Sequence, residues 1–150
     1  MPERKTLERA RRDRAQGKAA STQAGEFVRE EMDHIREGKH GARSTKQAIA
    51  IGLSKARRAG VKLPSPGSGT SERTRRQAAR EESRARRGAS RRSSPKRGRA
   101  IRRALKREGS SAASPSALSR QAKSAARRRS RAQRSAAAKK AARTRKREAR

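Results

Sequence analysis

The chain of 150 residues contains no cysteine, tryptophan or tyrosine and a single phenylalanine. Without cysteine it has no disulfide framework, thiol nucleophile or thiolate metal site, which is compatible with a reducing compartment. No apolar run approaches the ~20 residues of a membrane-spanning helix, and the first residues, MPERKTLERARRDRAQGK, lack the apolar core of a signal peptide. From these absences we expect a cytoplasmic protein.

Side chains suited to catalysis are also scarce. The only histidines are His34 and His40, and the sequence shows no cysteine or spaced carboxylate cluster that would complete a metal site with them. The segment Gly67-Ser68-Gly69 follows no predicted strand and precedes no Gly-Lys-Ser/Thr, so it is not a phosphate-binding loop. We therefore expect no enzymatic activity, no cofactor and no bound metal.

Acidic residues are few, because 13 Asp+Glu stand against 46 Lys+Arg and give a formal net charge of +33. A charge of this size indicates a polyanionic partner. Arginine supplies 34 of the basic residues and lysine 12, a bias that favours bidentate phosphate contacts and insertion into narrow minor grooves. Nucleic acid, most simply double-stranded DNA, is the expected partner, and RNA remains an alternative.

Apolar residues make up 29% of the chain and charged residues 39%, so most of it buries too little apolar surface to offset its ordering entropy. Charge is unevenly spread: residues 1–63 hold 16 Lys+Arg and 8 Asp+Glu, and residues 64–150 hold 30 and 5. After Leu63 the only large aliphatic residues are Ile101, Leu105 and Leu118. The sequence predicts a mainly α fold class: a small helical hairpin module with a long, largely disordered or conditionally helical basic tail.

Residues 1–20 are expected to contain a charged helix, and residues 21–63 an αα-hairpin. The first helix of the hairpin stops at Gly38, and its apolar residues share one face at about 100° per residue: Ala24, Phe27, Val28, Met32 and Ile35. Glu31 lies within the same face, where it either extends its carboxylate to solvent or pairs with the basic tail of its own chain or of a neighbouring one. For the second helix, Ser44 with Gln47 forms a capping-box pattern and Gly60 supplies the end.

The second hairpin helix, STKQAIAIGLSKARRAG, carries apolar residues on two sides. Ile49 and Leu53 face the hairpin partner, whereas Ile51 points roughly opposite. A hairpin this small is only marginally stable by itself. We therefore expect Ile51 to make a second contact, either with the charged helix of residues 1–20 or with another protomer. Ile51 is therefore the candidate residue for self-association as a homodimer.

A helix-turn-helix is the alternative interpretation of this segment, because Ala48-x-x-x-Gly52-Leu53-Ser54 resembles the core of that motif. The match fails at Arg58, which occupies a position where a recognition helix needs an apolar residue. One continuous helix is the simpler prediction.

Residues 64–70 are rich in Pro, Gly and Ser and are predicted to be a linker. Residues 71–150 form an Arg/Ala/Ser-rich cationic tail with helix-forming stretches at 71–87, around Ile101, and after Ser114-Pro115. Adjacent like charges oppose helix formation in water, so we expect a coil that becomes helical when phosphates neutralise it. Ser94-Pro95-Lys96-Arg97 is expected to form a turn that presents two cations to the minor groove.

Lys39-His40-Gly41 and the run Ser44–Arg57 resemble a family of small, basic, uncharacterised bacterial proteins with the pattern K-H-G…S-[TR]-K-Q-A-I-A-I-A/G-L-S-x-A-R. The resemblance covers roughly residues 20–64 and implies no established activity or catalytic residues. The end of the tail, SAAAKKAARTRKREAR, is similar in composition to linker-histone and bacterial histone-like tails, from which it departs by preferring arginine to lysine.

We expect a histone-like, nucleoid-associated protein that binds DNA without sequence preference through phosphate neutralisation by its tail. The lack of aromatic residues for base stacking favours duplex over single-stranded nucleic acid. The alternatives are an RNA- or ribosome-associated protein and an adaptor whose hairpin binds a protein partner. The candidate nucleic-acid-binding residues are Lys46, Lys55, Arg57, Arg58, Lys96, Arg97, Arg102, Arg103, Arg127, Arg128, Arg129, Lys139, Lys140, Arg143 and Arg145.

Overall fold

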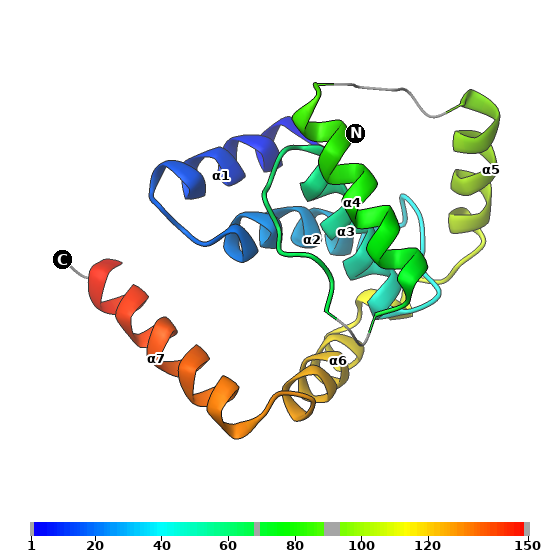
Figure 1. The fold of residues 1–150 in the computed structure, drawn as a ribbon. Coiled ribbons are helices and arrows are strands. Elements are labelled where there is room, and N and C mark those ends of the chain that lie inside the picture. Colours follow the sequence, from blue (N-terminus) through cyan, green and yellow to red (C-terminus); the bar gives the residue numbers. More distant parts are fainter. Residues whose placement is uncertain (1, 68–69, 89–93, 149–150) are drawn as a thin grey trace. The chain divides into compact units, whose positions relative to one another are not determined.

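The computed structural model of the protein describes residues 2–67, 70–88 and 94–148. All regular secondary structure of these residues is helical (Figure 1). The elements are α1 (Arg4–Ala15), α2 (Ala20–Arg36), α3 (Thr45–Arg58), α4 (Glu72–Arg86), α5 (Pro95–Lys106), the 3₁₀ helix η1 (Ser111–Ala113), α6 (Pro115–Arg127) and α7 (Arg131–Glu148). The chain divides into two units, Met1–Ser114 and Pro115–Arg150, of which the second holds α6 and α7.

The predicted helical class is confirmed, but the prediction of a largely disordered or conditionally helical tail is wrong. The described residues after 70 form α4, α5, η1, α6 and α7. Alanine and arginine have high helix propensity, and a like-charge pair one turn apart opposes it by only about 0.2–0.5 kcal/mol. Residues 68–69 of the predicted linker and of Gly67-Ser68-Gly69, and residues 89–93 and 149–150 of the tail, lie outside the described residues.

The N-terminal helices match the sequence prediction closely. In α3, the Ser44 hydroxyl accepts a hydrogen bond from the Gln47 N–H at 3.2 Å. Gly60 follows the helix with a φ of 88°, and the Val61 N–H then donates to the Ala56 carbonyl at 3.0 Å. Because α3 is continuous from Thr45 to Arg58, Gly52 lies inside a helix and the helix-turn-helix alternative is wrong.

The seam of the hairpin consists of small residues of α3 packed against α2. Ala48 and Ala56 are fully buried, whereas Ile49 and Leu53 are only half-buried. Gly52 lies so close to α2 that a Cβ added to it would be 2.7 Å from the Val28 Cα. The two backbones therefore approach each other where glycine leaves room.

Helix α1 and the end of the hairpin complete an apolar cluster around α2. Phe27 is fully buried, and Ala10 of α1 and Val61 beyond α3 lie in the same cluster. Leu7 of α1 and Leu63 are partly buried against it. This cluster is one part of the apolar core of the first unit, and it includes the single phenylalanine.

The second side of α3 is covered by α4, which the sequence had assigned to the tail. Ser54 of α3 donates a hydrogen bond to the buried carboxylate of Glu81 on α4. Ile51 lies one turn before Ser54 on the same side of α3 and is half-buried. The structure thus brings α4 to the side of α3 that carries Ile51, and the role of Ile51 in self-association stays a prediction.

The loop between α2 and α3 is tied to the chain that follows α5. The Gly41 N–H donates to the Leu105 carbonyl at 2.9 Å, and the Ala42 N–H donates to the Gly109 carbonyl at 3.2 Å. The Thr45 hydroxyl donates to the carbonyl of Ala112, in η1, at 2.7 Å. These bonds join segments more than sixty residues apart and hold the C-terminal end of α5 to the hairpin.

The expected turn at Ser94-Pro95-Lys96-Arg97 is instead the start of α5. Ser94 is the N-cap and Pro95 lies in the first turn, where a backbone N–H would have no partner inside the helix, so its absence costs no hydrogen bond.

Among the described residues, none of the helices has both the length and the apolar composition of a membrane span.

Candidate functional site

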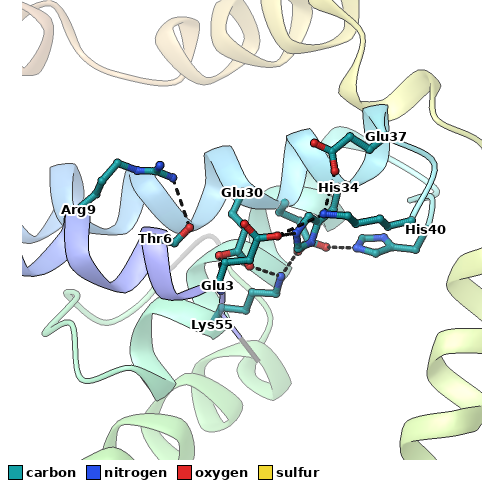
Figure 2. Close-up of polar contacts among 10 residues, drawn as sticks. Glu3, Thr6, Arg9, Glu30, His34, Glu37, His40 and Lys55 are labelled. Atoms are coloured by element: carbon teal, nitrogen blue, oxygen red, sulfur yellow. Dashed lines mark hydrogen bonds and ion pairs between the residues drawn. The ribbon is translucent and has the colours of Figure 1, made fainter.

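The most unusual feature of the hairpin is a pair of buried carboxylates on α2. Glu31 is 0% exposed and Glu30 is 3% exposed. Lys55 of α3 reaches both, with its Nζ 3.0 Å from Glu30 Oε1 and 2.7 Å from Glu31 Oε2 (Figure 2). Burial of a charged group requires such a partner, since an isolated carboxylate in the interior is strongly disfavoured. The sequence predicted that Glu31 reaches solvent or pairs with the tail. Both predictions are wrong, because Glu31 is buried and pairs with Lys55 inside the hairpin.

Both histidines of the chain lie at the same end of α2. The His40 Nδ1 lies 3.1 Å from the Gly41 carbonyl oxygen, and its Nε2 lies 3.3 Å from Glu31 Oε1. The His34 Nε2 lies 2.7 Å from Glu3 Oε1. The two imidazole rings meet edge to face with their centroids 6.0 Å apart. One ligand atom from each of Glu31, His34 and His40 lies within 4.8 Å of the others.

An outer layer of charged groups surrounds this cluster, and Figure 2 shows how they converge on the end of α2. The hydrogen bond from His34, followed by that from Lys39, lowers the pKa of Glu3. Glu37 and then Glu3 raise the pKa of Lys39 by accepting its hydrogen bonds. For Glu30, burial acts to raise the pKa, but hydrogen bonds from the Glu3 N–H, Lys55 and Thr6 outweigh it and leave the pKa lowered.

The carboxylate of Glu31 has more acceptor capacity than its surroundings use. Its oxygens lie against the Lys55 ammonium group and the His40 imidazole, yet neither of them accepts a hydrogen bond with suitable geometry. A carboxylate offers about four lone-pair sites, and buried polar atoms are seldom left without hydrogen bonds. The oxygens of Glu31 are therefore able to bind a further positively charged group.

The sequence analysis did not identify this cluster because its residues become neighbours only when the chain folds. Glu31 and His34 are three residues apart on α2, whereas His40 returns from the loop and Lys55 comes from α3. The one available signal was a glutamate within the apolar face of an amphipathic helix. Such a residue needs a buried partner, and the sequence alone did not identify it.

The predicted nucleic-acid-binding residues fall into two groups. Lys55 is held by Glu30 and Glu31, with only 14% of its side chain exposed, and Arg57 is half-buried. The others are exposed on the start of α3, its end, α5 and the second unit: Lys46, Arg58, Lys96, Arg97, Arg102, Arg103, Arg127, Arg128, Arg129, Lys139, Lys140, Arg143 and Arg145.

Helix α5 is sharply two-sided. At about 100° per residue, five of its six cations gather on one face, opposite Ile101 and Leu105, and only Arg97 lies beside Ile101. The five are Lys96, Arg99, Arg102, Arg103 and Lys106. The cationic face is exposed, and Ile101 is 52% exposed on the other. The sequence analysis predicted a turn at Ser94-Pro95-Lys96-Arg97 and a separate short helix around Ile101. The structure instead places the five cations on one helix, where they form a continuous positive face.

The second unit carries the densest positive charge. In α6, Arg120, Lys123 and Arg127 repeat at one-turn spacing and line a shallow depression of the surface. Cations cover most of the circumference of α7, and those of the last turn are Arg145, Lys146 and Arg147. Residues 115–150 hold 14 Lys+Arg and one acidic residue, Glu148.

The comparisons with known proteins bear on the hairpin and not on the basic helices. No curated protein and no solved structure matches the chain. The match to a family model agrees with the expected resemblance to an uncharacterised family, and it spans α2, α3 and the Glu31–Lys55 pair. Residues 11–66 of the chain are similar to a family of unknown function (DUF6496).

Proposed function

We propose that the protein is a histone-like DNA-binding protein that acts without sequence preference, by neutralising phosphates with the cations of α5, α6 and α7. The proposal differs from the one that the sequence favoured, because ordered helices rather than a disordered tail carry the charge. In a bacterial cell such binding would locate the protein in the nucleoid.

The observation that carries the proposal is that charged side chains form ion pairs in α1 to α4, whereas the described cations of α5, α6 and α7 have no carboxylate partner. Ion pairs within the chain occupy carboxylates of α1, α2 and α4, as in Arg9–Glu26 and Arg76–Glu72. In contrast, no ion pair joins a Lys or Arg to a carboxylate among residues 94–147, whose side chains the structure describes. Unpaired exposed cations release DNA counterions when they meet phosphates, which is the main source of non-specific affinity.

The spacing of the cations suits a phosphate backbone. One helical turn advances about 5.4 Å, so Arg99, Arg103 and Lys106 form a row of charges along one side of α5. Arginine adds a planar fork of donors that binds a phosphate through two hydrogen bonds. The major groove, about 12 Å wide, admits an α-helix. Each basic helix is therefore able to follow phosphates without reading bases.

The test compares two variants of equal charge. Arg102→Gln with Arg103→Gln removes two unpaired cations from α5, whereas Arg76→Gln with Arg86→Gln removes two that pair with Glu72 and Glu82 on α4. Affinity for a mixed-sequence DNA duplex is measured by fluorescence anisotropy at several salt concentrations. We expect the α5 variant to bind DNA more weakly. Its plot of the logarithm of the association constant against the logarithm of the salt concentration should also become less steep, by up to about 2. The α4 variant should change little in both respects. Equal losses in both would contradict the proposal.

A competition experiment separates DNA from RNA. Labelled DNA duplex bound to the full chain is challenged with unlabelled DNA or RNA duplex of the same sequence. We expect the DNA competitor to displace the label at a concentration no higher than the RNA. Displacement by RNA at a clearly lower concentration would replace DNA by RNA as the partner.

A further inference from the structure

We propose that Glu31, His34 and His40 bind one divalent first-row transition-metal ion, for which Zn²⁺ is the probe. Two imidazole nitrogens and a carboxylate oxygen are ligands that Zn²⁺ uses in proteins. The three ligand atoms lie within 4.8 Å of one another, and bonds of ~2.0–2.2 Å in a tetrahedron would bring them to about 3.3–3.6 Å. The two histidine side chains are 14% and 19% exposed, so they have room to rotate and an ion has a path to enter.

The hydrogen bonds of the histidines leave one nitrogen of each available as a ligand. The Gly41 carbonyl only accepts, so the His40 Nδ1 carries a proton toward it and the Nε2 faces Glu31. The Glu3 carboxylate likewise accepts from the His34 Nε2, so Nδ1 is the nitrogen that His34 would offer to an ion. A carbonyl or carboxylate on the other ring nitrogen is the usual support of a metal-binding histidine.

The contact between His40 and Glu31 needs a positive charge between its two atoms. In the neutral ring, the His40 Nε2 lone pair faces Glu31 Oε1 at 3.3 Å, and two lone pairs at that distance repel. Either a proton or a metal ion at this point removes the repulsion. Glu31 is fully buried and both its oxygens lack hydrogen bonds, so a metal ion would fill acceptor capacity that the protein leaves unused.

Local charge permits a cation here although the whole chain is strongly basic. The carboxylates of Glu3, Glu30 and Glu31 outnumber the ammonium groups of Lys39 and Lys55 around the cluster. Lys55 lies against Oε2 of Glu31, so in the metal-free protein it supplies the charge that the ion would otherwise provide. Lys55 is thus a competitor for the carboxylate.

A bound ion would tie α2 to the loop that leads to α3. His40 precedes Gly41, whose N–H holds the end of α5 through the Leu105 carbonyl. Metal binding at His34 and His40 would therefore act on the loop that holds the C-terminal end of α5. Because the folded chain binds the ion and the unfolded chain holds no preformed site, the metal raises the thermal midpoint of unfolding.

The experiment titrates the full chain, freed of metal by chelator, with Zn²⁺ by calorimetry and with Co²⁺ by visible absorption. We expect one ion per chain, ligand-dependent Co²⁺ bands, and a rise in the thermal midpoint with Zn²⁺. His34→Asn and His40→Asn should each abolish the bands, whereas Asp33→Asn, an exposed carboxylate on the same helix, should retain them. Wild-type protein without bands or midpoint shift overturns the proposal, as do bands that persist in both histidine variants.

Two further variants separate metal binding from a purely structural ion pair. Glu3→Ala removes the hydrogen-bond acceptor that supports His34 and should weaken Zn²⁺ binding by about 10–100-fold. Lys55→Met removes the competing ammonium group, so Zn²⁺ should bind it more tightly and raise its thermal midpoint by more than that of wild type. Weaker Zn²⁺ binding by a folded Lys55→Met protein, judged by circular dichroism, would contradict the site as proposed.

Discussion

Lys55 Nζ lies 2.7 Å from Oε2 of Glu31, a carboxylate that is 0% exposed between α2 and α3. The pair puts two opposite charges inside a hairpin whose apolar core is small. Such a pair contributes little net stability when it is complete, but the loss of one partner leaves the other charge buried and unpaired. The hairpin is therefore sensitive to either residue taken alone.

Lys55→Met in the metal-free protein should destabilise the first unit by about 3–5 kcal/mol, because Glu31 is left buried without its main countercharge. Chemical denaturation followed by circular dichroism gives the free energy of unfolding. The double variant Lys55→Met with Glu31→Met should recover much of the loss, since neither charge remains. A single variant as stable as wild type would show that Glu31 is not buried as described.

Gly52→Ala should destabilise the hairpin although alanine is the better helix former. The new Cβ would lie 2.7 Å from the Val28 Cα and 3.0 Å from its N, and overpacking of this kind costs about 1–3 kcal/mol. Gly25→Ala on α2 is the matched control, because nothing lies within 4 Å of its added Cβ. The control should stabilise the protein by up to about 1 kcal/mol. Thermal unfolding of the two variants should shift in opposite directions.

Gly41→Ala should release the end of α5 from the loop between α2 and α3. The added Cβ would lie 1.9 Å from the Glu108 carbonyl oxygen, so the backbones have to separate. We expect the amide of Ala42, which donates to Gly109, to lose its protection from hydrogen exchange. Gly109→Ala is the control, since its added Cβ has open space, and protection there should persist. Unchanged protection in Gly41→Ala would mean that the two segments are not joined as described.

Local signals were sufficient to predict the helices of residues 1–63 and their ends. Ser44 and Gly60 mark the limits of α3 because a cap hydroxyl and a positive φ act within a few residues of their own position. The contact of Gly41 with Leu105 was not predictable in this way. It joins backbone groups that carry no sequence signature, and it explains why part of the expected tail belongs to the first unit.

The candidate sites differ in the same way, because one was predictable from composition and the other depends on tertiary contacts. Exposed cations such as Arg102 and Lys139 were predictable from composition, since nothing in the chain remains to neutralise them. The convergence of Glu31 and His40 depends on the path of the loop between α2 and α3, and Lys55 was predicted as a phosphate ligand because its buried partners lie on another helix. Tertiary packing thus changed the role of Lys55 while its charge stayed the same.

The central claim is that unpaired cations of α5, α6 and α7 bind DNA phosphates, and the salt dependence of binding tests it most directly. The affinity of the full chain for a mixed-sequence DNA duplex is measured between about 50 and 300 mM salt, and the logarithm of the association constant is plotted against that of the salt concentration. We predict a straight line whose negative slope is about 0.9 per phosphate contact, with several contacts, and the same slope for an unrelated duplex. Affinity that is independent of salt would contradict the account.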